Sequence, residues 1–133
     1  MIKLNITNGD VSNRKIKITS NLSLGEISSI GNIYEIRLSV ENGDYISYVI
    51  PYFDDKEAAL SLSFYKEKLT YLNISLGENY AFPAYEITEK KKATVRSRLA
   101  SIGGENDYIW GSVSYSEDIK GGNVSIRIKY NQG

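Results

Sequence analysis

The run "RLSVENGDYISYVIPY" at 37–52 constrains the fold of this chain more than any other stretch. Apolar and polar residues alternate on both sides of Asn42-Gly43, and such alternation is typical of strands that bury one face. An Asn-Gly pair readily takes the two positive φ angles of a type I′ turn, so the sequence predicts an antiparallel hairpin with this pair at its tip. Glu41 and Asp44 would then face each other across the turn.

A hexamer occurs twice, as "NLSLGE" at 21–26 and as "NISLGE" at 73–78. Lysine and threonine residues match upstream of both copies, and "YEI" follows both, at 34–36 and at 85–87. The order of these matches predicts an internally duplicated hairpin unit, spanning about 2–52 and about 58–102, in which the hexamer links two hairpins. Under this interpretation the hexamer is a shared corner of the fold rather than a binding site.

Two segments fit more than one structure. Residues 54–72 alternate like a strand around Leu60, Leu62 and Phe64, but they also fit a helix capped by Asp54, so a short helix near 55–66 stays open. Residues 88–102 could be the second unit's matching hairpin. They could equally form a helix that Thr88 caps and Gly103-Gly104 end.

The segment 107–130 predicts a C-terminal hairpin with a longer loop around Gly121-Gly122. If Tyr115 pairs with Val124, the core face carries Ile109, Val113, Tyr115, Val124, Ile126, Ile128 and Tyr130. The other face then carries Tyr108, Trp110, Ser112, Ser114, Ser125, Arg127 and Lys129. Strands at such even spacing predict a mainly β chain, with residues 1–133 forming a single antiparallel β-sandwich or barrel of about eight to ten strands.

Composition argues against several kinds of site. The chain has no cysteine and no histidine, which removes thiol chemistry, disulfides, the commonest general base and the commonest transition-metal ligand. Sixteen basic residues balance sixteen acidic ones, so no whole-chain positive field attracts nucleic acid or anionic lipid. The sequence shows no signal peptide and no apolar run long enough for a bilayer. We therefore expect a cytoplasmic protein or one assembled into a virion.

The remaining candidates for catalysis are carboxylates. Asp54, Asp55 and Glu57 form one group, and Glu117 with Asp118 forms another, but both lie in polar, turn-like sequence that rarely shifts a pKa enough for acid–base work. Neither group has the spacing of a calcium loop, and the glycine pairs lack the residues of a phosphate-binding loop. We expect no enzyme activity, no catalytic residue, no metal site and no cofactor.

Binding residues are predicted on two hairpins. On the terminal hairpin, Trp110 would lie opposite Lys129 with Tyr108 and Arg127 beside them, and on the middle hairpin Arg37 would face Tyr48. Aromatic and basic side chains on one sheet face are typical of single-stranded nucleic-acid binders, and five basic residues between Lys90 and Arg98 could extend such a track.

Eleven tyrosines favour a protein partner instead, because tyrosine supplies rigid contact area at interfaces. The sequence therefore predicts a non-catalytic structural or protein-binding module, in the style of a bacteriophage particle component or a phage protein that binds a host factor. Its expected partner is another protein or further copies of itself. Single-stranded nucleic acid is the alternative partner, and neither a membrane nor a small-molecule cofactor is expected.

Overall fold

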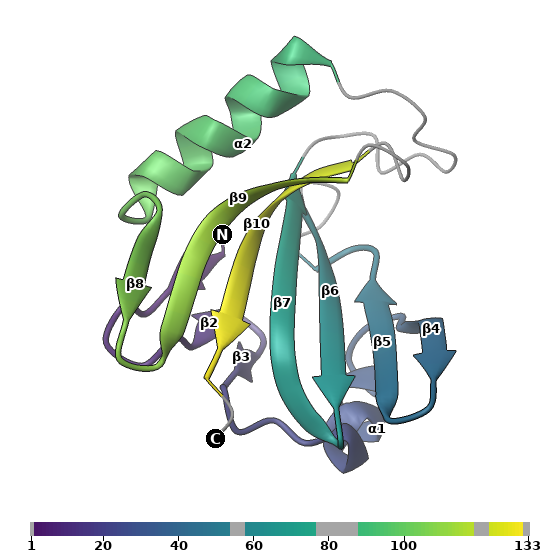
Figure 1. Ribbon diagram of the computed structural model, residues 1–133. Helices are drawn as coiled ribbons and strands as arrows, with labels where there is room; N and C mark the ends of the chain where they lie inside the picture. The colour runs from purple at the N-terminus through teal and green to yellow at the C-terminus, as the bar shows by residue number, and fades with distance from the viewer. Residues whose placement is uncertain (1, 54–57, 77–87, 119–122, 132–133) are drawn as a thin grey trace.

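The computed structural model describes residues 2–53, 58–76, 88–118 and 123–131. Seven antiparallel strands form one large sheet in the order β4-β5-β6-β7-β10-β9-β8 (Figure 1). Their bounds are β4 (Arg37–Asn42), β5 (Tyr45–Ile50), β6 (Ala58–Tyr65), β7 (Lys68–Leu76), β8 (Asn106–Tyr108), β9 (Gly111–Asp118) and β10 (Asn123–Tyr130).

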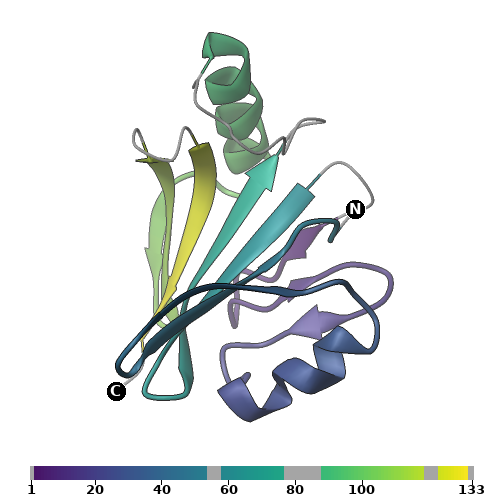
Figure 2. The same cartoon turned by 90° about the vertical axis from the view of Figure 1, so that its right-hand side faces the viewer.

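The N-terminal segment and the longer helix cover one face of this sheet, which we call the inner face (Figure 2). The N-terminal elements are a three-stranded sheet of β1 (Lys3–Leu4), β2 (Val11–Ser12) and β3 (Lys17–Ile18), a 3₁₀ turn η1 (Leu24–Glu26) and helix α1 (Ile27–Gly31). Helix α2 (Glu89–Ser101) packs beside them. The ten strands of the described residues confirm the prediction of a mainly β fold with eight to ten strands.

One hydrophobic core fills the space between these layers. Alternate residues of the central strands point into it, among them Leu62, Leu72 and Ile126, none of which has solvent exposure. Helix α2 joins the core through Val95 and Leu99, which share a helix face because they are four residues apart. Burial of each such side chain stabilises the fold by about 1.5–3 kcal/mol.

Side chains of the large sheet and of α2 bind the backbone of the N-terminal segment. The Trp110 Nε1–H donates to the Ile6 carbonyl at 2.8 Å, and the Tyr130 hydroxyl donates to the Gly9 carbonyl at 2.8 Å. The Arg98 Nη2 donates to the Ile2 carbonyl at 2.9 Å. These contacts hold the small sheet against the inner face, because each joins a segment near residue 6 to one about a hundred residues later.

The middle hairpin is confirmed, but its turn is displaced by one residue. Asn42 pairs with Tyr45, so Gly43 and Asp44 are the central residues. Gly43 has a φ of +62°, and a positive φ at the first central position alone is the signature of a type II′ turn. The predicted type I′ turn at Asn42-Gly43 is therefore wrong, and Glu41 pairs with Ile46 rather than facing Asp44.

The two copies of the hexamer form different structures. The first copy turns into η1, where the Glu26 carboxylate accepts a hydrogen bond from the Ser23 N–H at 3.2 Å. The second copy continues β7 through Leu76, and its last two residues lie outside the described residues. The same letters take different conformations because β6 and β10 pair with both edges of the second copy. The predicted shared corner is therefore wrong.

Both open segments are decided by their surroundings. Residues 58–65 form β6 rather than a helix, because strands pair with both of its edges, and 54–57 lie outside the described residues. Residues 89–101 form α2, so the matching hairpin is wrong and the helix is confirmed. The Thr88 hydroxyl accepts from the Lys91 N–H at 3.1 Å, and at the other end of the helix the Gly104 N–H donates to the Leu99 carbonyl at 2.9 Å.

Neither helix of the described residues is long and apolar enough to cross a bilayer.

The terminal hairpin forms with a register shifted by two residues. Tyr115 pairs with Ile126 instead of Val124, and a shift of two keeps the side chains of β9 and β10 on their predicted faces. Val113, Val124, Ile126, Ile128 and Tyr130 are accordingly buried. Ile109 is 99% exposed, contrary to the prediction, because β9 begins only at Gly111 and Ile109 lies at the tip of the β8–β9 turn.

We expect Gly9→Ala to destabilise the fold through Trp110. Gly9 has a φ of +81°, and a Cβ there would lie 2.5 Å from the Trp110 Cε3. Backbone strain and steric overlap together should lower the free energy of unfolding, measured by urea denaturation, by about 2–4 kcal/mol. Gly43→Ala, at a positive φ with open space around it, should cost about 1–2 kcal/mol.

A double-mutant cycle isolates the overlap. In a Trp110→Ala background the indole is gone, so Gly9→Ala should cost no more than Gly43→Ala does. If the losses in unfolding free energy caused by Gly9→Ala and by Trp110→Ala simply add in the double variant, the contact between the two residues is contradicted.

Candidate functional site

The outer face of the large sheet is covered by no described element, and Figure 1 looks onto it. Its centre carries small side chains, of which Ser47, Ser63 and Ser125 are each 5% exposed and Ser75 is 8% exposed. These serines are almost buried although they point outward, because longer side chains such as Tyr45 and Arg127 stand beside them. The serines therefore form a recessed polar surface, which we call the floor, and the longer side chains around it, such as Tyr45 and Arg127, form a rim.

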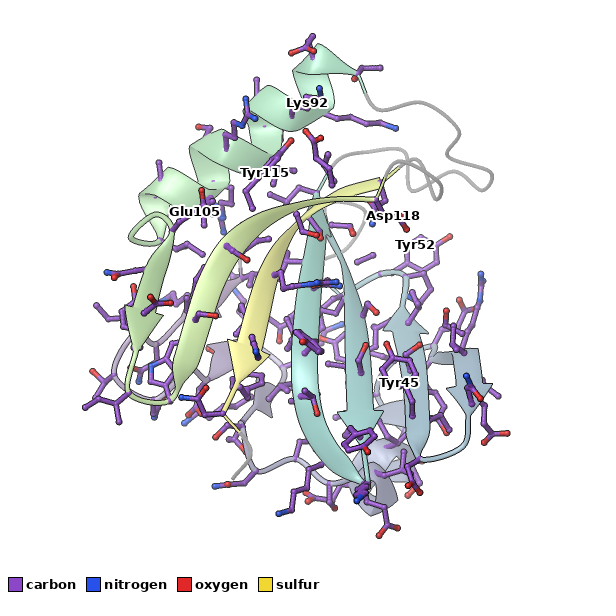
Figure 3. All side chains as sticks on the ribbon, in the orientation of Figure 1. Tyr45, Tyr52, Lys92, Glu105, Tyr115 and Asp118 are labelled. Carbon is purple, nitrogen blue, oxygen red and sulfur yellow. The ribbon has the colours of Figure 1, made fainter. Side chains whose placement is uncertain are left out.

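Two of the rim side chains are held in place by the sheet. The Tyr45 hydroxyl donates to the Ser63 Oγ at 3.1 Å, which lays the ring along the outer face (Figure 3). The Arg127 guanidinium lies 5.0 Å from the Tyr71 ring centroid, and its Nε donates to the Asn73 Oδ1 at 3.4 Å. Such contacts restrict the side chains before a partner arrives, which lowers the entropy lost on binding.

A polar hollow of about 420 Å³ lies on this face, and we call it the serine hollow. Hydroxyl and amide groups make up most of its lining, and the Asn123 Nδ2 donates to the Ser75 Oγ at 3.1 Å inside it. Arg127 is the one cation among the described residues that line it. The lining residues are Ser39, Val49, Ala59, Leu60, Ser61, Asn73, Ser75, Ser116, Glu117, Asp118, Asn123, Ser125 and Arg127.

A second hollow, of about 610 Å³, lies beside the β6–β7 turn, and we call it the lysine hollow. It is lined by Tyr65, Lys66, Lys68, Thr70, Lys129, Tyr130 and Asn131. Three of these described residues carry an ammonium group and none carries a carboxylate. Lys66 extends its Nζ to 5.5 Å from the Tyr65 ring centroid. The serine hollow is thus polar, whereas the lysine hollow is positively charged.

The predicted cluster on the terminal hairpin divides between the two faces. Arg127 and Lys129 lie on the outer face, where Lys129 pairs with Ser112 and with Tyr71. Trp110 instead stacks on Tyr108 at 5.1 Å with an angle of 5° between the rings, and it also contacts Tyr130 and Gly9 on the inner side. The predicted pairing of Trp110 with Lys129 is therefore wrong, because Trp110 belongs to a two-residue turn and not to β9.

The predicted pair on the middle hairpin is also separated. Arg37 pairs with Val49, whereas Tyr48 pairs with Leu38 and Leu62 and packs against the core. The Arg37 guanidinium forms an ion pair with Glu35 at 2.7 Å. A bulge between Leu38 and Val40 changes the alternation of β4, which the sequence pattern did not reveal.

Several residues of the outer face were not predicted as site residues, namely Tyr45, Tyr65, Lys66, Lys68 and Tyr71. The alternation Tyr71-Asn73-Ser75 marks the polar side of β7 and could have pointed to one of them. The lysines come together only in the folded chain, since Lys129 is about sixty residues from Lys66 and Lys68.

Helix α2 is joined to β9 by a cluster of charged groups (Figure 3). The Tyr115 hydroxyl donates to the Glu117 carboxylate at 2.7 Å, Lys92 lies 3.7 Å from the same carboxylate, and the Arg96 guanidinium lies 4.6 Å from the Tyr115 ring centroid. Lys92 and Arg96, and also Arg98, are thus engaged within the chain, and this part of the predicted basic track serves to dock α2.

Two pKa values are shifted in this cluster. Desolvation, followed by the hydrogen bond to Glu117, raises the pKa of the Tyr115 phenol. The hydrogen bond from Tyr115 lowers the pKa of Glu117, and Lys92 and Arg96 lower it further. Among the described residues no three carboxylates gather into a group that could hold a metal ion.

Comparison with known proteins gives one informative likeness. Neither a protein-family model nor a curated protein matches this chain. A chain of the solved structure "Rhs1-CT in complex with cognate immunity protein RhsI1" is similar to it, with a TM-score of 0.65 and 12% sequence identity over 98% of this chain and 88% of that chain. At this identity the likeness shows a shared fold.

The likeness corrects one expectation from the sequence. The prediction that this chain is not an enzyme is wrong: it rested on the missing cysteine and histidine, and the chain shares its fold with a chain of the structure "Rhs1-CT in complex with cognate immunity protein RhsI1". Catalysis without these two residue types would use carboxylate, hydroxyl, phenol, ammonium or guanidinium groups.

We expect Glu117→Gln to lower the pKa of the Tyr115 phenol. The substitution removes the negative charge that disfavours the phenolate, while desolvation remains, so the pKa should fall but stay above that of a free tyrosine. The chemical shift of the Tyr115 ¹³Cζ, followed by NMR through alkaline pH, measures this. Tyr52, an exposed tyrosine, provides the reference signal, and an unchanged Tyr115 titration would contradict the contact.

Proposed function

We propose that this chain is a protein-binding module and that the outer face of its large sheet is the recognition surface. The observation that carries the proposal is the arrangement of Tyr45, Tyr71 and Arg127 around an almost buried serine floor. Tyrosine and arginine are the residue types that most often dominate binding energy at protein interfaces. Here they are already restrained, so a partner need not order them.

The shared fold supports the same function. The similar chain comes from a complex of Rhs1-CT with its cognate immunity protein, which is an association between two specific proteins. We infer that this chain likewise forms a complex with one cognate protein. A rim of tyrosines on an uncovered sheet face of seven strands offers room for an interface of ordinary size, about 800 Å² on each partner.

Nucleic acid is less favoured as the partner. Bases bind by stacking on free aromatic faces, but Trp110 lies between Tyr108 and Gly9, and Arg127 and Lys66 lie over the rings of Tyr71 and Tyr65. The chain also carries no net charge. The expectation of a bacteriophage protein stays a prediction, since no observation bears on it.

The proposal predicts that the rim is required for partner binding. The triple variant Tyr45→Ala, Tyr71→Ala, Arg127→Ala should bind the partner at least about 100-fold more weakly, because each residue is a candidate anchor of about 1–2 kcal/mol. The partner is first isolated on the immobilised wild-type chain, and its dissociation constant for each variant is then measured by titration calorimetry with both proteins purified.

The matched control is Ile6→Ala with Ile33→Ala, two exposed apolar residues of the N-terminal segment. This variant should bind as tightly as the wild type, and urea unfolding should show that both variants remain folded. A partner that is retained by the rim variant and lost by the control would place the recognition surface elsewhere. Failure to reach a saturable one-to-one complex would reject the protein-binding function itself.

A further inference from the structure

We propose that the lysine hollow is a docking site for an acidic segment of the partner protein. This inference rests on the proposed function and names the chemistry of the partner. The hollow gathers Lys66 and Lys68 from one end of the β6–β7 hairpin and Lys129 from β10. A hollow lined by charges of one sign concentrates the field and attracts groups of the opposite sign.

The three ammonium groups are not neutralised within the described part of the chain. No ion pair joins Lys66, Lys68 or Lys129 to a described carboxylate, whereas Arg37 forms one such pair and Lys92 forms two. Like charges held at one hollow repel each other, and a carboxylate placed among them would relieve this repulsion. The unpaired cations therefore point to an acidic ligand.

The β6–β7 turn supplies a second observation. Its central residues Lys66 and Glu67 have φ angles of 50° and 69°, a conformation that side chains bearing a Cβ adopt only at a cost and that Asn-Gly adopts readily. The turn is held by the Lys66 N–H, which donates to the Asp44 carbonyl, and by the Glu67 carbonyl, which accepts from the Leu24 N–H, both at 3.0 Å. Strained residues kept at a surface site are a reason to look for a function.

The turn brings Lys66 to the hollow. Its ammonium lies over the Tyr65 ring, and Lys66 lines the hollow together with Lys68 and Lys129. An Asn-Gly turn would give the same hairpin without this charge. The proposed contact with the acidic segment gives a lysine at this strained position a function.

The geometry favours carboxylates over a nucleic-acid strand. Lys66 occupies one face of Tyr65 and Arg127 one face of Tyr71, so neither ring presents both faces for base stacking. Lysine ammonium groups bind as point charges with rotatable donors, which suits several glutamate or aspartate side chains on an extended peptide. The occupant is therefore a run of acidic residues on the partner protein.

Three labelled probes test the inference by fluorescence anisotropy with the full chain. They are an acetylated and amidated hexaglutamate peptide, the matched hexaglutamine peptide and a six-nucleotide oligothymidine. We expect hexaglutamate to bind at about 20 mM salt and its affinity to fall at about 200 mM salt. At the lower salt concentration it should bind more tightly than either of the other two probes. Lys68→Gln and Lys129→Gln should each weaken hexaglutamate binding about 3- to 10-fold.

The turn gives a sharper variant. Lys66→Asn with Glu67→Gly leaves the net charge unchanged and relieves the strain, so the midpoint of thermal unfolding should rise by about 3 °C or more while hexaglutamate binding falls. Lys90→Gln on α2 removes one charge at a distance from the hollow and should leave both quantities unchanged. Equal losses from Lys90→Gln and Lys129→Gln would reduce the effect to net charge and overturn the site.

The remaining outcomes separate this inference from the proposed function. Tighter binding of oligothymidine than of hexaglutamate would assign the hollow to nucleic acid and overturn the inference. Absence of hexaglutamate binding, with the partner still lost by the Tyr45, Tyr71 and Arg127 variant, would reject the acidic segment and keep protein binding. Hexaglutamate bound at the hollow, with partner binding insensitive to that variant, would instead reject the outer rim as the recognition surface.

Discussion

Tyr130 ends the last strand of the large sheet, and its hydroxyl donates to the Gly9 carbonyl in the first loop of the chain. Burial, with a smaller contribution from Asp10, raises the pKa of this phenol, so it remains a neutral hydrogen-bond donor at any physiological pH. The Trp110 ring packs on the same loop and binds the Ile6 carbonyl. These contacts hold the small sheet over the inner face, and the apolar side chains that the large sheet buries against the small sheet depend on that cover.

Closure of the inner face determines what the outer face can be. A seven-stranded sheet has two faces, and the described elements suffice to cover one of them. The uncovered face carries serines where the covered face carries leucine and isoleucine, so its exposure costs little hydrophobic free energy. No buried side-chain nitrogen or oxygen of the described residues lacks a hydrogen-bond partner. A partner that covers this floor therefore has to supply hydrogen bonds only to the polar atoms that are still exposed in the free chain.

The sequence predicts the elements of this fold better than it predicts the site. Local signals predicted the middle hairpin and the faces of β9 and β10, and they offered the capped helix α2 as one of two alternatives, because turn glycines, alternation and a capping threonine act within a few residues. Tertiary contacts decided the rest. β6 and β10 make the second hexamer a strand, and a two-residue turn at Ile109-Trp110 sends Trp110 to the inner side.

The site itself could not be predicted, because its residues are far apart in the sequence. Alternation assigned Arg127 and Lys129 to the outer face correctly, but it gave no register between β10 and β7, and this register brings Lys129 beside Tyr71. The lysine hollow also depends on the β6–β7 turn, whose Lys66-Glu67 pair is a poor turn sequence and gave no local signal. A site that violates local preference is the kind that sequence rules miss.

The edges of the large sheet explain why recognition falls to its face. Strand β8 ends the sheet with three residues, two of them the polar Asn106 and Asp107, and offers little backbone to an incoming strand. Strand β4 is longer and exposes Leu38 and Val40, yet a bulge lies between these two residues and charged side chains flank them. Short length, bulges and charges are the features by which sheets resist strand addition at their edges. With both edges protected and the inner face closed, the outer face is the broad surface that the described part of the chain leaves open to a partner.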